Sequence, residues 1–107
     1  MSRRVSLTDR ARRQLDDAAE WWSKNRSAEQ AERWADLFTQ AILDLGESAQ
    51  RQPRARESKS LPIELRELLF GLGKKPSHRA LFAIRPDQVV VYAIRHVSQS
   101  DVGIDDL

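Results

Sequence analysis

The sequence predicts an α+β domain in which a helical hairpin packs on one face of a curved, mostly antiparallel sheet. Residues 9–45 contain two stretches with apolar side chains at helical spacing, joined by a short polar loop, and such helices pack as an antiparallel hairpin. Residues 65–96 contain three segments rich in Val, Ile, Leu and Phe, separated by turn residues, which is the pattern of an antiparallel meander. With a further strand at residues 3–7, the predicted order is β-α-α-β-β-β.

The first helix is predicted over residues 9–25. Thr8 is placed to cap it, and Asp9 puts a negative charge in the first turn, where the helix dipole favours one. Trp21 lies at the margin of the apolar face, so we expect it to be partly exposed. The face itself consists of Ala11, Leu15, Ala18 and Trp22.

The second helix is predicted over residues 27–45. Ser27 begins it, and Gln30 three residues later completes a capping-box pattern. Gly46 follows directly, and we expect it to end the helix in the left-handed conformation. The apolar face, whose aromatic residues we assign to the core, consists of Ala31, Trp34, Ala35, Phe38, Ala41, Ile42 and Leu45.

The meander is predicted to contain strands at residues 65–72, 77–85 and 88–95. Pro86 suits the second position of the tight turn between the last two strands. The last strand is apolar on both faces, which indicates a central position, whereas the short segment 3–7 is expected at an edge. We expect the helices to cover one face of the sheet and the other face, with its arginines, to stay partly open. The polar segment 47–60 is expected to be a loop or a frayed helix end.

Composition restricts the classes of function. The 107 residues are enough for one core, so a single domain over residues 1–107 is predicted. With no cysteine and only two histidines, we expect no metal and no other cofactor. No apolar run approaches the roughly 18 residues of a membrane span. We therefore expect a cytoplasmic protein that does not contact a membrane.

The charges are distributed unevenly along the chain. The formal net charge is +2, but residues 51–85 hold nine basic and three acidic side chains. The tail at residues 97–107 has three aspartates and no basic residue. The basic segment could attract phosphate or an acidic protein partner, although composition alone favours a solvated surface with solubilising charge.

Four side chains of the meander could carry chemistry: Arg66, Glu67, Arg79 and His96. Because adjacent strands lie only about 5 Å apart, the four could converge on the sheet. The alternative is structural, with ion pairs across neighbouring strands and His96 hydrogen-bonded at the sheet edge. Further basic residues that could contact phosphate or a target are Arg85, Lys74 and Lys75.

Five short sequence motifs follow one another between Val5 and about His96. They are Leu7-Thr8 before Ala11, Ser27 through Ala31, Leu61-Pro62 leading into Leu65-Arg66-Glu67-Leu68, His78-Arg79-Ala80-Leu81-Phe82, and Val89 through His96. In this order and spacing they resemble the RelE/ParE toxin superfamily of bacterial type II toxin–antitoxin systems, and the likeness covers nearly the whole chain.

The resemblance implies a small cytoplasmic toxin that is neutralised by a cognate antitoxin, which wraps a helix and an extended strand around it. Two activities are known on this fold. RelE-like members cut mRNA in the ribosomal A site without a metal, whereas ParE-like members act on DNA gyrase without catalytic chemistry of their own. A third possibility is an inactive member that only binds its antitoxin.

If the chain is a nuclease, the resemblance implies that Glu67 is the general base, His96 the general acid and Arg79 the phosphate clamp, assisted by Arg66. The acidic tail replaces the tyrosine or basic residues that nuclease members often carry there, and the chain has only four lysines for contact with rRNA. We therefore favour ParE-like action on gyrase, with RelE-like mRNA cleavage on the ribosome as the alternative.

Overall fold

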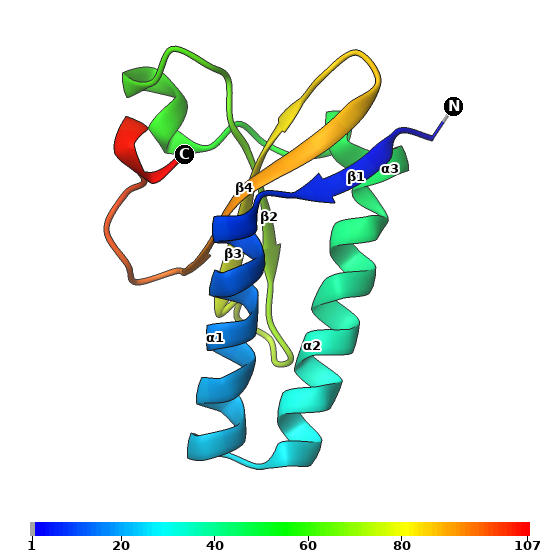
Figure 1. The fold of residues 1–107 in the computed structure, drawn as a ribbon, viewed down its shortest axis with the longest axis vertical. Helices are drawn as coiled ribbons and strands as arrows, with labels where there is room; N and C mark the ends of the chain where they lie inside the picture. The colour runs from blue at the N-terminus through cyan, green and yellow to red at the C-terminus, as the bar shows by residue number, and fades with distance from the viewer. Residues whose placement is uncertain (1) are drawn as a thin grey trace.

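The computed structural model describes residues 2–107, and it places a helical hairpin on one face of a four-stranded sheet (Figure 1). The hairpin consists of helix α1 (Asp9–Asn25) and helix α2 (Ala28–Leu43), and a one-turn helix α3 (Leu45–Ser48) follows. The predicted capping residues are confirmed, because the side chains of Thr8 and Ser27 accept backbone N–H groups of the first turns of α1 and α2. No helix within residues 2–107 is long and apolar enough to cross a membrane.

The sheet consists of β1 (Arg4–Leu7), β2 (Arg66–Phe70), β3 (His78–Ile84) and β4 (Gln88–His96) in the spatial order β1-β4-β3-β2. Strands β2, β3 and β4 form the predicted antiparallel meander, and β1 pairs with β4 in parallel. The α+β class and the order of elements are therefore confirmed, as are the edge position of β1 and the central position of β4.

A β-bulge interrupts the pairing of β3 with β4. Beyond the turn, Phe82 pairs with Val91, but the next pair is Leu81 with Ala93, so Tyr92 is an extra residue in β4. Such an insertion shifts the register by one residue. As a result, every later residue of β4 lies on the opposite face from the one that an uninterrupted ladder would give it.

The main core lies between the hairpin and the sheet. Trp34 and Phe38 of α2 and Phe82 and Val91 of the sheet are fully buried there. The aromatic residues of the helices therefore belong to the core, as predicted, apart from Trp21, which is 51% exposed. The regular apolar stripe of α2 explains this packing, because positions three and four apart lie on one face of a helix.

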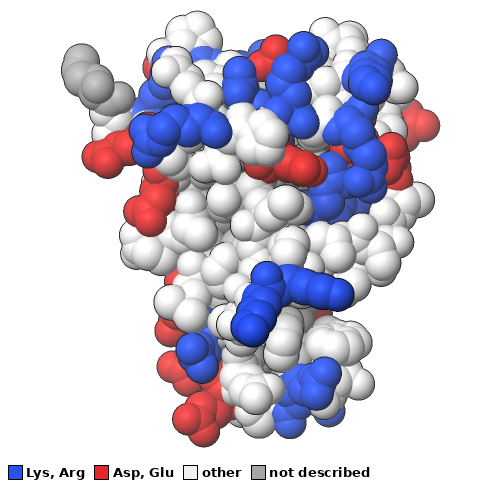
Figure 2. Space-filling model, turned by 180° about the vertical axis from the view of Figure 1, so that it is seen from behind, with Lys and Arg blue, Asp and Glu red and all other residues white. Residues whose placement is uncertain are grey.

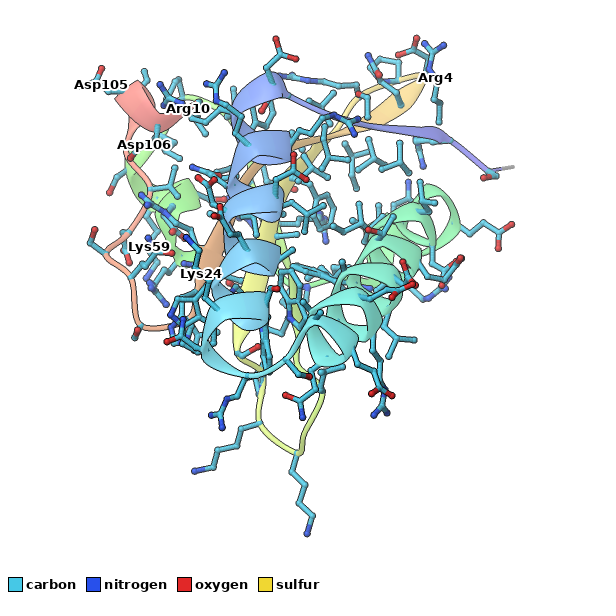
Figure 3. All side chains as sticks on the ribbon, turned by 60° about the horizontal axis from the view of Figure 1, so that its bottom comes forward. Arg4, Arg10, Lys24, Lys59, Asp105 and Asp106 are labelled. Atoms are coloured by element: carbon cyan, nitrogen blue, oxygen red, sulfur yellow. The ribbon has the colours of Figure 1, made fainter. Side chains whose placement is uncertain are left out.

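The second face of the sheet is covered, so the expectation of an open face is wrong. Residues 52–65 and the C-terminal tail pack over it and bury Leu81 and Ala93 beneath Leu65 and Val102. Polar contacts hold the tail in place: Arg10 donates to the Asp105 carbonyl at 2.8 Å, and Arg56 pairs with Asp101 at 2.6 Å. Figure 3 shows Asp105 and Asp106 beside Arg10 at this end of the molecule.

Segment 47–60 is more regular than the loop expected from its composition. It contains the end of α3 and two 3₁₀ turns, Ala49–Arg51 and Arg56–Ser60. The second turn is tied to the sheet by the Ser58 hydroxyl, which donates to the Leu65 carbonyl and accepts the Leu65 N–H. Segment 47–60 is therefore ordered and forms part of the layer that covers the second face of the sheet.

Gly46 does not end a helix in the left-handed conformation, because no glycine within residues 2–107 has a positive φ. It lies in α3, where its carbonyl accepts the Arg3 N–H at 2.8 Å. A Cβ at this position would clash with the Arg3 carbonyl oxygen. The glycine is therefore required for the close approach of the N-terminal strand to α3, and not for backbone freedom.

Replacing Gly46 by alanine should lower the free energy of unfolding by about 1–3 kcal/mol, because the N-terminal backbone must move away from the new methyl group. Chemical denaturation measures the effect. Gly73→Ala is the matched control, since a Cβ there has no neighbour within 4 Å. Equal stability of the two variants would contradict this explanation of Gly46.

Candidate functional site

Arg79 is enclosed by carboxylates and is not open to a ligand. It is 2% exposed. Its Nη1 and Nη2 donate to the two carboxylate oxygens of Glu57 at 2.8 and 2.6 Å, and its Nε donates to Glu67 Oε2 at 3.0 Å. Glu57 Oε2 also accepts the backbone N–H of Val102 at 3.1 Å. A guanidinium paired in this way links the second face of the sheet to the C-terminal tail.

The pair of Arg79 and Glu57 is ionised within the fold. Burial opposes the charge on Glu57, but hydrogen bonds from Arg79 and from the Val102 N–H outweigh it, so the pKa of Glu57 lies below its usual range. Burial likewise opposes the charge on Arg79, and the hydrogen bond and charge of Glu57 raise its pKa in spite of it. Each charge is therefore stabilised chiefly by the other.

The structure does not bring Arg79 and His96 together. Arg79 points to the face covered by the tail, whereas His96 pairs with His78 on the face covered by the helices. The bulge at Tyr92 is the physical reason, because an uninterrupted ladder from the turn would pair His96 with Ser77, on the same face as Arg79. The expected convergence of the four side chains is not met.

The remaining predicted residues also lie apart. Arg66 donates to the Gln52 carbonyl at 2.6 Å, Arg85 donates to the Tyr92 hydroxyl at 2.8 Å, and Lys74 and Lys75 lie exposed in the β2–β3 loop. Figure 2, seen from behind, shows the basic side chains interspersed with acidic ones over the upper part of the molecule. These residues form no single phosphate-binding cluster.

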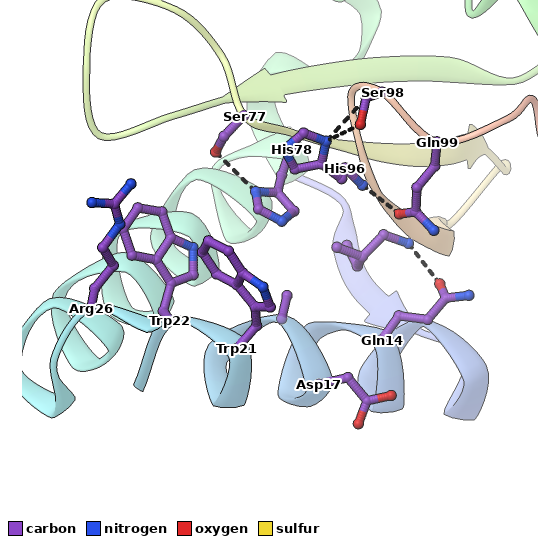
Figure 4. A pocket seen from close by; sticks show the side chains of 12 residues that line it. Gln14, Asp17, Trp21, Trp22, Arg26, Ser77, His78, His96, Ser98 and Gln99 are labelled. Carbon is purple, nitrogen blue, oxygen red and sulfur yellow. Dashed lines mark hydrogen bonds between the residues drawn. The ribbon is translucent and has the colours of Figure 1, made fainter. Parts of the chain in front are cut away.

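A groove between α1 and the ends of β3 and β4 is lined by His96, one of the predicted site residues (Figure 4). The groove is partly open to solvent and has a volume of about 680 Å³. The α1 side contributes Trp21, Trp22 and Arg26, and the sheet side contributes His78 and His96. Pockets of this size are typical of small-molecule sites. We therefore take this groove as the candidate functional site within residues 2–107.

His96 is held in one orientation by the turn that follows it. Its Nδ1 accepts the backbone N–H of Ser98 at 3.1 Å and contacts the Ser98 hydroxyl at 2.7 Å. An Nδ1 that accepts a hydrogen bond carries no proton, so in the neutral ring Nε2 carries it. His96 therefore presents an N–H donor from the end of the strand.

His78 is the buried member of the histidine pair. Its ring lies 4.9 Å from that of Trp34 and 5.2 Å from that of His96, measured between centroids. Burial, together with the proximity of His96, lowers the pKa of His78 to about 4. His78 is therefore neutral at physiological pH and belongs to the floor of the groove.

This pKa predicts a loss of stability in mild acid. An unfolded histidine takes up a proton below its ordinary pKa of 6.5, whereas His78 in the fold does so only near 4. The contribution of neutral His78 to the free energy of unfolding is thus fully present above about pH 6.5. It is lost as the pH drops towards 4, which lowers the free energy of unfolding by up to about 3 kcal/mol. Denaturation at several pH values measures the slope. His78→Phe should flatten it between pH 6.5 and 4, and an unchanged slope would contradict the assignment.

The sequence did not identify Glu57 as a member of a buried polar cluster, and it did not identify Trp21 as a member of the candidate site. Glu57 lies in the polar segment that has no periodicity, 22 residues from its partner Arg79, so no local pattern reveals the pair. For Trp21 the sequence gives one weak indication of a role at the surface: a tryptophan at the margin of an apolar helix face is expected to stay partly solvated.

Comparisons with known proteins agree with this fold. The solved structure "Chromosomal ParDE TA system from P. aeruginosa" contains a chain that superposes with a TM-score of 0.71 at 18% identity, covering 91% of this chain and 98% of that chain. The likeness shows that the two chains share an α+β fold, with a helical hairpin before the meander. No curated protein sequence is significantly similar to this chain.

The sequence family agrees with the fold. The family described as "ParE toxin of type II toxin-antitoxin system, parDE" matches residues 5–101. The protein therefore belongs to the ParE toxin family, within the RelE/ParE superfamily that the short sequence motifs predicted. Membership implies that the protein is the toxin component of a type II toxin–antitoxin system and has an antitoxin partner.

Proposed function

We propose that this toxin arrests growth by acting on DNA gyrase in the cytoplasm and that a cognate antitoxin neutralises it by direct binding. The observation that carries the choice of target is the environment of Arg79. The nuclease alternative needs a cationic side chain near the scissile phosphate, next to an acid and a base. Arg79 is instead buried against Glu57 and Glu67.

The distribution of the groups supports the same choice. A general acid at His96 would be separated from Glu67 by the sheet, because the two lie on opposite faces. Action by surface binding needs no such convergence, and it suits a protein whose long hairpin is well formed. The membership in the ParE family points in the same direction.

The surface of the hairpin supports an antitoxin partner. Leu37 and Leu43 of α2 are 45% and 52% exposed. Leu43 borders a groove formed by the two helices and β1, which is lined by apolar side chains such as Leu7 and Leu15. Exposed apolar residues beside an apolar groove are typical of a surface that a protein partner covers.

Expression of the toxin alone in a bacterial host tests the proposal, with growth, cell shape and protein synthesis scored together. We expect growth arrest with filamentous cells and continuing translation, and restoration of growth when the antitoxin is coexpressed. His96→Gln should keep this phenotype. Rapid arrest of translation with cut mRNA, lost in His96→Gln, would instead support the nuclease alternative. Normal growth would indicate an inactive member of the family.

A further inference from the structure

Gln14, Gln99 and His96 line the groove between α1 and the ends of β3 and β4, and each has an acceptor atom occupied by a hydrogen bond within the chain. The side-chain oxygen of Gln14 accepts the Ile94 N–H at 2.8 Å, and that of Gln99 accepts the His96 N–H at 2.7 Å. With both oxygens engaged, each amide presents its NH₂ group. Nε2–H of His96 adds a third donor at the same end of the groove.

These donors are held rigidly. Ile94 follows the bulge in β4. Its backbone N–H donates to the side-chain oxygen of Gln14, and this hydrogen bond joins the sheet to α1. Gln99 is fixed twice to His96, since its own N–H also donates to the His96 carbonyl at 3.0 Å. Donors that are fixed before a ligand arrives bind it at a lower entropic cost.

The other end of the groove has a positive charge and an aromatic wall. The side chain of Arg26 is exposed and has no ion-pair partner among residues 2–107. Trp21 is half exposed and forms a T-shaped contact with Trp22, whose ring centroid lies 5.7 Å away. Figure 4 shows the carboxylate of Asp17 pointing away from the two histidines.

We propose that this groove is a nucleotide-binding site, in which Trp21 stacks on the base, Arg26 binds the phosphate, and Gln14, Gln99 and His96 donate to carbonyl oxygens on the base edge. A flat ring suits an exposed indole, an oxyanion suits an unpaired guanidinium, and a base that carries ring carbonyls supplies the acceptors. A free nucleotide and the end of a nucleic-acid strand share this chemistry. The site is one of binding and involves no bond cleavage.

The site is independent of the proposed action on gyrase. It lies on the helix side of the sheet, away from the buried Arg79 pair and away from the apolar groove beside Leu43. Lys74 and Lys75 lie in the loop that ends directly before Ser77, which lines the groove. They give a longer strand additional positive charge near the site.

Isothermal titration of the full chain with uridine 5′-monophosphate tests the proposal. We expect saturable binding that is about tenfold weaker for Trp21→Ala, since stacking on an indole is lost, and weaker to a similar degree for Arg26→Gln. Arg13→Gln is the matched control, because Arg13 is an exposed arginine of α1 outside the groove. It should bind like the unmodified chain.

Two further ligands separate the contributions and the sources. Uridine without phosphate and inorganic phosphate alone should each bind more weakly than the nucleotide. A 5′-phosphorylated oligonucleotide that binds more tightly than the mononucleotide identifies a strand end as the natural ligand, and the reverse order identifies a free nucleotide. The proposal is overturned if the mononucleotide and the oligonucleotide both fail to bind, or if Trp21→Ala and Arg26→Gln bind them as well as Arg13→Gln does.

Discussion

Replacing Arg79 by alanine should lower the free energy of unfolding by about 3–5 kcal/mol, because it leaves the buried carboxylate of Glu57 without its cation. Glu57 is 3% exposed, and Arg79 donates to both of its oxygens. Since a small domain has only about 5–15 kcal/mol of stability, the variant is expected to be partly unfolded at growth temperature. Chemical denaturation of the purified variant measures the loss.

Two variants provide controls for this prediction. Arg56→Ala removes an ion pair whose side chains are about half exposed, and such a pair contributes at most about 1 kcal/mol. The double change Glu57→Gln with Arg79→Met removes both charges and keeps an acceptor for Val102, so it should be more stable than Arg79→Ala. If Arg79→Ala is as stable as Arg56→Ala, the buried pair does not hold the tail as we describe.

This prediction also decides how toxicity assays are interpreted. Loss of toxicity in Arg79→Ala would be expected from unfolding alone, and it would not identify Arg79 as a contact to the target. A role in binding can be assigned only in a variant whose stability and antitoxin binding are shown to be intact.

Replacing Trp34 by alanine should also cost about 3–5 kcal/mol, because it opens a cavity at the centre of the main core. The Trp34 ring is fully buried, and its centroid lies 6.3 Å from that of Trp22 and 5.3 Å from that of Phe38. The same ring packs against His78, so the variant should also lose less stability than the unmodified chain when the pH falls from 6.5 to 4.

Trp21→Ala is the matched control for the core, since it removes the same kind of side chain from a half-exposed position. It should cost less than about 1.5 kcal/mol. Thermal or chemical denaturation compares the two variants. A similar loss in both would mean that the helical hairpin does not pack on the sheet through Trp34.

The elements of the fold were predictable because each has a local cause. Thr8 and Ser27 carry cap signals, the apolar side chains of α2 recur at helical spacing, and Pro86 marks the turn of the meander. The prediction for Gly46 is wrong for a physical reason. A glycine after a helix usually serves the backbone, but here it admits a neighbouring strand that is distant in sequence.

The site could not be predicted in the same way, because its geometry depends on one inserted residue. Nothing in the alternating pattern of β4 marks Tyr92 as a bulge, yet the bulge decides which face His96 occupies. The partner of Arg79 lies in a segment without periodicity. To predict which side chains share a face of the sheet, the pairing register of β3 with β4 must be known. The sequence pattern alone does not define that register.

The most direct test of the proposed function is an assay with purified DNA gyrase, supercoiled or relaxed plasmid, and the purified toxin. We predict that the toxin reduces supercoiling and causes cleaved plasmid to accumulate, and that the antitoxin prevents both effects. His96→Gln should act like the unmodified toxin. Unaffected gyrase activity, together with cleavage of mRNA on ribosomes by the same preparation, would contradict the proposal.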